Sequence, residues 1–132
     1  MHIFLFLPCL QYGTMMQVGT VDFYPGTEGN YGSYQPGCSK IIDSVAACSH
    51  SRSHYLYGFS LTQSVSPASK VCHGDPHEIP KTCVTLSNDT LAREHINMGY
   101  WALPTTAGMF TVEVTAKEPY CAPPTAIRPP NP

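Results

Sequence analysis

The sequence predicts an α/β chain that is rich in loops and cross-linked by disulfides. Short apolar or alternating runs of the kind that form strands stand beside one stretch with the apolar spacing of a helix. Thirteen prolines and ten glycines among 132 residues favour irregular connections over a helical bundle. Six cysteines, an even number, favour cross-links between the loops.

Two strands are predicted in the first part of the chain. Residues 2–7 form an apolar run that ends before Pro8, which is typical of a buried strand. Residues 21–24 form a second extended run, which Pro25-Gly26 stops. The following stretch, residues 26–36, is rich in Gly, Tyr and Ser and is expected to be an irregular loop.

One helix is predicted from Ser49 to about Leu61. Ser49 has a side chain suited to an N-cap, and Tyr55, Leu56 and Phe59 form an apolar stripe. Residues 66–97 lack sustained periodicity and are expected to be loop.

The last predicted strand covers residues 110–115, where apolar and polar side chains alternate as in a half-buried strand. Residues 122–132 are rich in proline with nothing to pack, which predicts a disordered tail. We therefore expect one small domain over residues 1–121 followed by this tail.

Composition excludes several classes of function. Charged residues are 12% of the chain and the formal net charge is −2, with Lys and Arg scattered singly. Because no basic stripe can neutralise phosphates, nucleic acid is not an expected partner. No apolar run approaches the roughly 20 residues of a membrane-spanning helix, so no transmembrane segment is expected.

The cysteines indicate an exported protein. None forms a C-x-x-C pair, and the short spacings from Cys38 to Cys48 and from Cys72 to Cys83 favour local disulfide loops. The sequon at Asn88 is a candidate glycosylation site and agrees with export. The apolar run at residues 2–7 lacks a positive n-region, so we expect the signal peptide of a parent protein to lie upstream.

His50 is the main candidate for chemistry. At the predicted start of the helix, the helix dipole would disfavour an imidazolium and keep the ring able to accept a proton. A disulfide at Cys48 would also hold the backbone just before it, an arrangement suited to a general base. The alternative on residue type alone is a surface histidine.

Several blocks in order along the chain resemble the pancreatic-lipase family. That family carries a G-H-[VA]-D-F-Y-P-N-G-G segment, a Q-P-G-C, and a C-x-H-x-R-[SA]-Y-x-Y-[FY] block. The matching residues here, within 11–121, are Val21-Asp-Phe-Tyr-Pro25, Gln35-Pro-Gly-Cys38, Cys48-Ser-His50-Ser-Arg52-Ser53, Tyr55, Tyr57, Cys72, Cys83, Met98-Gly-Tyr100 and Gly108-Met-Phe-Thr-Val112.

The resemblance implies the C-terminal part of the catalytic domain of a secreted lipase or phospholipase A1, with an α/β-hydrolase fold and an incomplete sheet. His50 would be the histidine of a Ser-Asp-His triad acting on lipid esters at a membrane or lipid interface, with no cofactor and no metal. Cys38 would pair with Cys48 across the lid, and Cys72 with Cys83.

Three departures from the family pattern matter. Thr20 stands where the family has His, and residues 26–32 form a longer, altered loop. The nucleophile motif G-x-S-x-G is absent, and its nearest approach, residues 58–62, lies within the predicted helix. Because such triads run Ser, Asp, His along the chain, we expect this chain to hold the histidine, to lack the serine and the aspartate, and to be inactive alone.

The nine residues between Cys38 and Cys48 would make a short lid, which in this family resembles phospholipase A1 members. Two other classes stay open. The first is a non-catalytic secreted homologue that acts as a binding or storage protein. The second is a zinc site, since His50 and His54 lie at i, i+4, and His73 and His77 flank Cys72.

The remaining candidates have plainer interpretations. We expect surface positions for the other histidines and a core position for Trp101. Cys9 and Cys121 can pair with each other or with residues elsewhere. The surface histidines in question are His54, His73, His77 and His95.

Overall fold

The structure, a computed structural model, describes residues 2–3, 16–38, 42–62, 70–75, 82–87, 96–118 and 120, and for residues 2–3 and 42–46 it describes the backbone only. Several expectations fall elsewhere. Most of the first predicted strand and all of the proline-rich tail lie outside the described residues, as do Cys9, Asn88 and Cys121.

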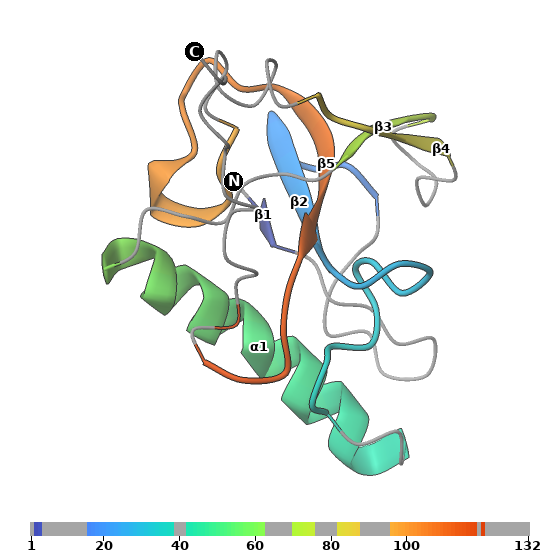
Figure 1. Cartoon of the computed structure of the whole chain (residues 1–132), viewed down its shortest axis with the longest axis vertical. Helices are drawn as coiled ribbons and strands as arrows, with labels where there is room; N and C mark the ends of the chain where they lie inside the picture. The colour runs from blue at the N-terminus through green and yellow to red at the C-terminus, as the bar shows by residue number, and fades with distance from the viewer. Residues whose placement is uncertain are drawn as a thin grey trace, which may run out of the picture.

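The described residues form a mixed sheet with one long helix beside it (Figure 1). Strands β1 and β2 run parallel, β2 and β5 run parallel, and β3 is antiparallel to both β5 and β4. The order across the sheet is β1-β2-β5-β3-β4. The strands are β1 His2–Ile3, β2 Val21–Gly26, β3 Lys70–His73, β4 Thr82–Thr85 and β5 Gly108–Glu113; the helices are α1 Ile42–Thr62 and the short 3-10 helix η1 Gly99–Trp101.

One face of the sheet packs against α1. Leu56 of α1, which is fully buried, joins side chains of alternate positions on the two central strands, including Phe23 of β2 and Phe110 of β5. The rings of Phe23 and Phe110 lie 5.8 Å apart, centroid to centroid, from residues that pair in the strand register. Ile96 and Met98, just before η1, complete this cluster, so it joins α1, the sheet and the segment leading to η1.

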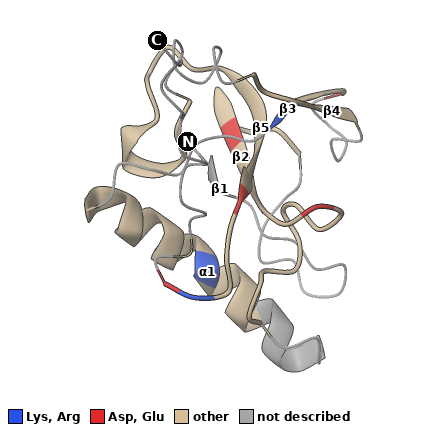
Figure 2. Ribbon diagram, viewed as in Figure 1, with Lys and Arg blue, Asp and Glu red and all other residues tan. Residues whose placement is uncertain are grey.

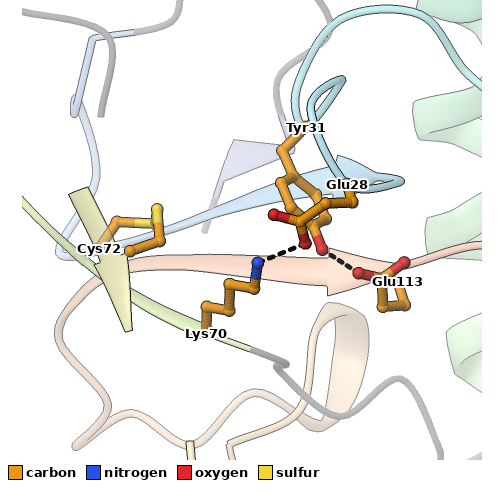
Figure 3. Close-up of polar contacts among 6 residues, drawn as sticks. Glu28, Tyr31, Lys70, Cys72 and Glu113 are labelled. Atoms are coloured by element: carbon orange, nitrogen blue, oxygen red, sulfur yellow. Dashed lines mark hydrogen bonds and ion pairs between the residues drawn. A yellow bond between two sulfur atoms is a disulfide. The ribbon is translucent and has the colours of Figure 1, made fainter. Parts of the chain in front are cut away.

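The opposite face is covered by residues that follow β2. The Tyr31 hydroxyl donates a hydrogen bond to the Glu113 carboxylate, and Lys70 forms an ion pair with Glu28 (Figure 3). These contacts tether the segment after β2 to both β5 and β3. Burial, and then the negative charge of Glu28, raise the pKa of Glu113 above its usual range.

β5 is therefore buried on both faces, and the prediction of a half-buried strand was wrong in this respect. Met109 and Thr111, on the face opposite Phe110, are as buried as the core positions. The cover comes from Tyr31 and from the Cys72–Cys83 pair, which lie far from β5 in sequence. The alternation of apolar and polar residues along one strand shows which side chains share a face. It does not show which other segments of the chain cover that face.

The helix begins at Ile42, seven residues before Ser49, so the predicted N-cap was wrong. Residues 42–48 contain no glycine or proline that would prevent the helix from starting earlier. Ser49 is fully buried inside α1, and its hydroxyl oxygen accepts the backbone N–H of Gln35 at 3.2 Å. Most of the expected lid loop between Cys38 and Cys48 is thus helical.

The expectation of loop over residues 66–97 was wrong at β3 and β4. These strands form an antiparallel pair in which Cys72 lies directly opposite Cys83, and the two cysteines are disulfide-bonded. Four-residue strands are too short to show a clear period in sequence.

Trp101 is 48% exposed, which overturns the expected core position. It lies at the end of η1 next to Tyr100, and the two rings are perpendicular with centroids 5.4 Å apart. Core positions near η1 are taken by Ile96 and Met98 instead.

Candidate functional site

His50 lies within α1, eight residues after its first residue, and its side chain is half-buried. The effect of a helix dipole fades beyond the first turn, so the sequence-based argument that the helix N-terminus acts on His50 does not hold. The backbone before it is held by the Cys38–Cys48 disulfide, whose Cα atoms lie 5.8 Å apart. This is the disulfide that the resemblance implied.

The segment Gln35–Cys38 lies against α1 on the N-terminal side of His50. The buried Gln35 donates its backbone N–H to the Ser49 hydroxyl and its side-chain Nε2–H to the carbonyl of Pro25, at 2.9 Å. Gly37 has a positive φ of 83°, and a Cβ there would lie 2.9 Å from the carbonyl oxygen of Ala116. Only glycine fits this turn without displacing its neighbour.

Three blocks separated in sequence therefore meet in one place. Pro25 ends the first block, Gln35 and Cys38 belong to the second, and Cys48 and Ser49 to the third. Two hydrogen bonds and one disulfide join them directly. The residue at the centre of the third block is His50.

Asp22, in the first block, is fully buried in β2. Its carboxylate accepts the backbone N–H groups of Val18 and Gly19 at 3.0–3.2 Å, which holds the turn that enters β2. Burial, followed by the charge of Asp22, raises the pKa of Tyr24 to about 12. The phenol of Tyr24 therefore stays protonated at neutral pH.

The other histidines are less constrained. His54 is exposed one turn after His50, with the ring centroids 5.9 Å apart, and His73 is exposed at the end of β3. His77 and His95 lie outside the described residues. The surface interpretation of His54 and His73 is confirmed.

The arrangement of these side chains does not favour the zinc-site alternative. Cys72 is disulfide-bonded and has no thiolate to offer a metal. In the part of the chain that the structure describes, no group of three or more His, Cys, Asp and Glu side chains converges.

Ser60, the serine of the nearest approach to a nucleophile motif, has a structural role. It is buried in α1, donates to the carbonyl of Tyr57 at 2.6 Å and accepts the backbone N–H of Tyr100 at 2.8 Å. A nucleophile would need its hydroxyl exposed on a sharp strand-to-helix turn.

The sequence did not indicate that two buried residues of this region, Gln35 and Arg52, are parts of the site. Gln35 and Arg52 were noted within motif blocks, yet both are buried and both bridge the blocks. A signal for Arg52 exists: it is the only Lys, Arg, Asp or Glu between Asp43 and Lys70.

Comparison with known proteins supports the resemblance. No protein-family model matches the sequence. A phospholipase A1 from Polybia paulista is 31% identical over 113 residues, which cover 83% of this chain and 31% of that protein. Lipase member H from Xenopus tropicalis is 31% identical over 130 residues, covering 83% of this chain and 25% of that protein. Pancreatic lipase-related protein 2 from Sus scrofa is 36% identical over 70 residues, covering 42% of this chain and 14% of that protein.

The chain belongs to this lipase family. It spans between a quarter and a third of the length of the first two relatives. Among its described residues, no helix is both long enough and apolar enough to cross a membrane.

Proposed function

We propose that this chain is the histidine-bearing, C-terminal part of an α/β-hydrolase domain in an exported serine ester hydrolase that breaks down lipids. The observation that carries the proposal is the meeting of three family blocks immediately before His50 in α1, through the Gln35–Ser49 and Gln35–Pro25 hydrogen bonds and the Cys38–Cys48 disulfide. The relatives, named as a phospholipase A1 and two lipases, support the same reaction class.

In the proposed mechanism, His50 acts as general base. A serine attacks the carbonyl carbon of the lipid ester while the imidazole takes the hydroxyl proton, and an aspartate orients the ring. The imidazolium then returns the proton to the leaving alcohol, and water releases the acyl group by the same route. The serine and the aspartate come from outside these 132 residues, so the chain by itself is inactive.

The proposed substrate is a phospholipid, cleaved as a phospholipase A1 would. Only nine residues separate Cys38 from Cys48, and residues 42–47 among them belong to α1. So short a segment supplies little apolar surface to cover a long acyl chain. Export is supported by the two disulfides, which persist in oxidising compartments.

The test compares two histidines in the longest protein encoded by the transcript that includes these residues. His50→Ala is expected to lower turnover of phosphatidylcholine by about 10⁴–10⁶-fold, because triad members act as a unit. His54→Ala is the matched control, the same residue type one turn further along α1, and is expected to change turnover less than about threefold. Equal losses in both variants, at unchanged melting temperature, would exclude His50 as the base.

A second candidate is a non-catalytic homologue that binds lipid, since this chain carries the family's histidine block without G-x-S-x-G and so leaves the identity of the nucleophile position open. The same transcript decides between the two. A serine in that motif and a following aspartate, together with hydrolysis, support the enzyme. A substituted serine, with phospholipid binding but no hydrolysis, supports the binding protein.

A further inference from the structure

Figure 2 shows a basic segment, drawn blue, in an otherwise uncharged stretch of α1. This segment is Arg52, a cation that is only 7% exposed. Burial of a guanidinium is unfavourable unless its donors and its charge are satisfied. Nη2 contacts a carbonyl oxygen and a disulfide sulfur, and the guanidinium face lies on an aromatic ring. Nη1 is buried without a hydrogen-bond partner among the described residues.

On one side, Arg52 holds the segment that carries Cys38. Its Nη2 donates to the carbonyl of Pro36 at 3.2 Å and lies 3.8 Å from the Cys38 sulfur. That sulfur is bonded to Cys48, four residues before Arg52 on α1. The guanidinium and the disulfide thus fasten the same loop to the same two turns of the helix.

On the other side, Arg52 stacks on Tyr120, with the guanidinium carbon 3.9 Å from the ring centroid. The same ring contacts Tyr55 and Phe59 of α1, with centroids 6.2 and 5.5 Å away. Tyr120 has a positive φ of 64°. Its backbone N–H donates to the carbonyl of Lys117 at 2.8 Å, which closes the turn that presents the ring.

We propose that Arg52, held between Pro36 and Tyr120, is a positioning residue for His50. The inference rests on the proposed function of His50. At 100° per residue, positions 50 and 52 point about 200° apart around the helix axis, so their side chains leave α1 on nearly opposite sides. Arg52 therefore acts by setting the rotation of α1, without touching the reacting groups.

The geometry makes catalysis sensitive to this rotation. A turn of about 10° moves an atom that lies about 6 Å from the helix axis by roughly 1 Å. A misplacement of that size can lower turnover by about 10²-fold. Lysine cannot replace the arginine, because a point charge does not stack on a ring and donate to a carbonyl in the same plane.

The first experiment measures the position of α1 in the 132-residue chain, independently of activity. Residual dipolar couplings of backbone amides report the orientation of α1 relative to β2 and β5. Arg52→Lys and Tyr120→Leu are each expected to change the couplings of α1 while those of the sheet are kept. Lys117→Met removes an exposed cation from the turn that carries Tyr120. It is expected to leave the couplings of both α1 and the sheet unchanged. Unchanged α1 couplings in both Arg52→Lys and Tyr120→Leu would overturn the proposal, whatever the enzyme does.

The second experiment measures hydrolysis in the longest encoded protein. Arg52→Lys is expected to lower kcat by about 10²-fold with KM unchanged, and Tyr120→Phe, which keeps the ring, to restore what Tyr120→Leu loses. The double variant Arg52→Lys/Tyr120→Leu is expected to have a kcat no lower than that of the less active of the two single variants. If His50→Ala abolishes activity while Arg52→Lys has the same kcat as Lys117→Met, the positioning role of Arg52 is wrong and the proposed function stands. If His50→Ala keeps activity, the proposed function itself fails.

Discussion

Replacement of Gly99 by alanine tests the contact between η1 and α1. Gly99 has a positive φ of 92°, and an added Cβ would lie 2.3 Å from both the Cβ and the Oγ of Ser60. Ser60 cannot move away freely, because its hydroxyl is bonded to the Tyr57 carbonyl and to the Tyr100 N–H. The substitution therefore strains the backbone and displaces a buried, doubly bonded side chain.

The cost of Gly99→Ala follows from three contributions to the free energy of unfolding. An L-residue in the left-handed region loses about 1–2 kcal/mol. Overpacking of a buried contact costs about 1–3 kcal/mol, and loss of one hydrogen bond about 1 kcal/mol. We expect a total of about 3–6 kcal/mol, which is a lowering of the melting temperature by roughly 10–25 °C for a chain of this length.

Two other glycines serve as controls in chemical and thermal unfolding with the disulfides intact. Gly29 has a positive φ of 78° but nothing within 4 Å of an added Cβ, so Gly29→Ala should cost only about 1 kcal/mol. Gly58 lies in α1 with nothing within 4 Å, so Gly58→Ala should stabilise by about 1 kcal/mol. A Gly99→Ala variant within about 0.5 kcal/mol of Gly29→Ala would refute the reasoning, and Ser60→Gly should recover part of the loss in a double variant.

Two further predictions concern the two faces of the sheet. Glu113 holds its proton to higher pH in the folded chain than in the unfolded chain, where its pKa has the ordinary value of 4.5. The stabilisation that results is therefore full below pH 4.5 and is lost as the pH rises through the raised pKa of the folded state. Glu113→Gln removes this titration, so its melting temperature relative to the unsubstituted chain should rise as the pH increases from the ordinary glutamate pKa through the raised one. A constant difference would show that Glu113 is not the group responsible. Leu56→Ala should lower the free energy of unfolding by about 2–5 kcal/mol, because Leu56 is fully buried. Leu61→Ala, at a position 51% exposed on the same helix, should change it by less than about 0.5 kcal/mol, and similar losses in both would contradict the packing described.

Local patterns predicted the central strands well. The extended run at residues 21–24 lies in β2, and the alternation at 110–115 overlaps β5. β2 continues through Pro25 and Gly26, which pair with Val112 and Glu113. A proline that ends a run in sequence can remain in a strand when its missing N–H is not needed by the neighbour.

The candidate site was predicted in part. The order of the blocks and the two cysteine pairs were legible, because motif spacing and cysteine spacing are properties of the chain alone. The contacts between the blocks could not be predicted from the sequence, because Gln35 meets Ser49 only when α1 packs beside the loop. The early start of α1 changed the surroundings assigned to His50 while leaving it at the centre of the block.

The sequence by itself determined the central strands β2 and β5, the presence of a helix around residues 49–61, the cysteines available for pairing and the family to which the chain belongs. Each depends on residue type and on spacing along the chain. Only the tertiary structure decided that Arg52 is buried, that Trp101 is exposed and that both faces of β5 are covered. Whether a side chain is buried depends on partners distant in sequence, such as Tyr120 for Arg52 and Tyr31 for β5, and no local period encodes those partners.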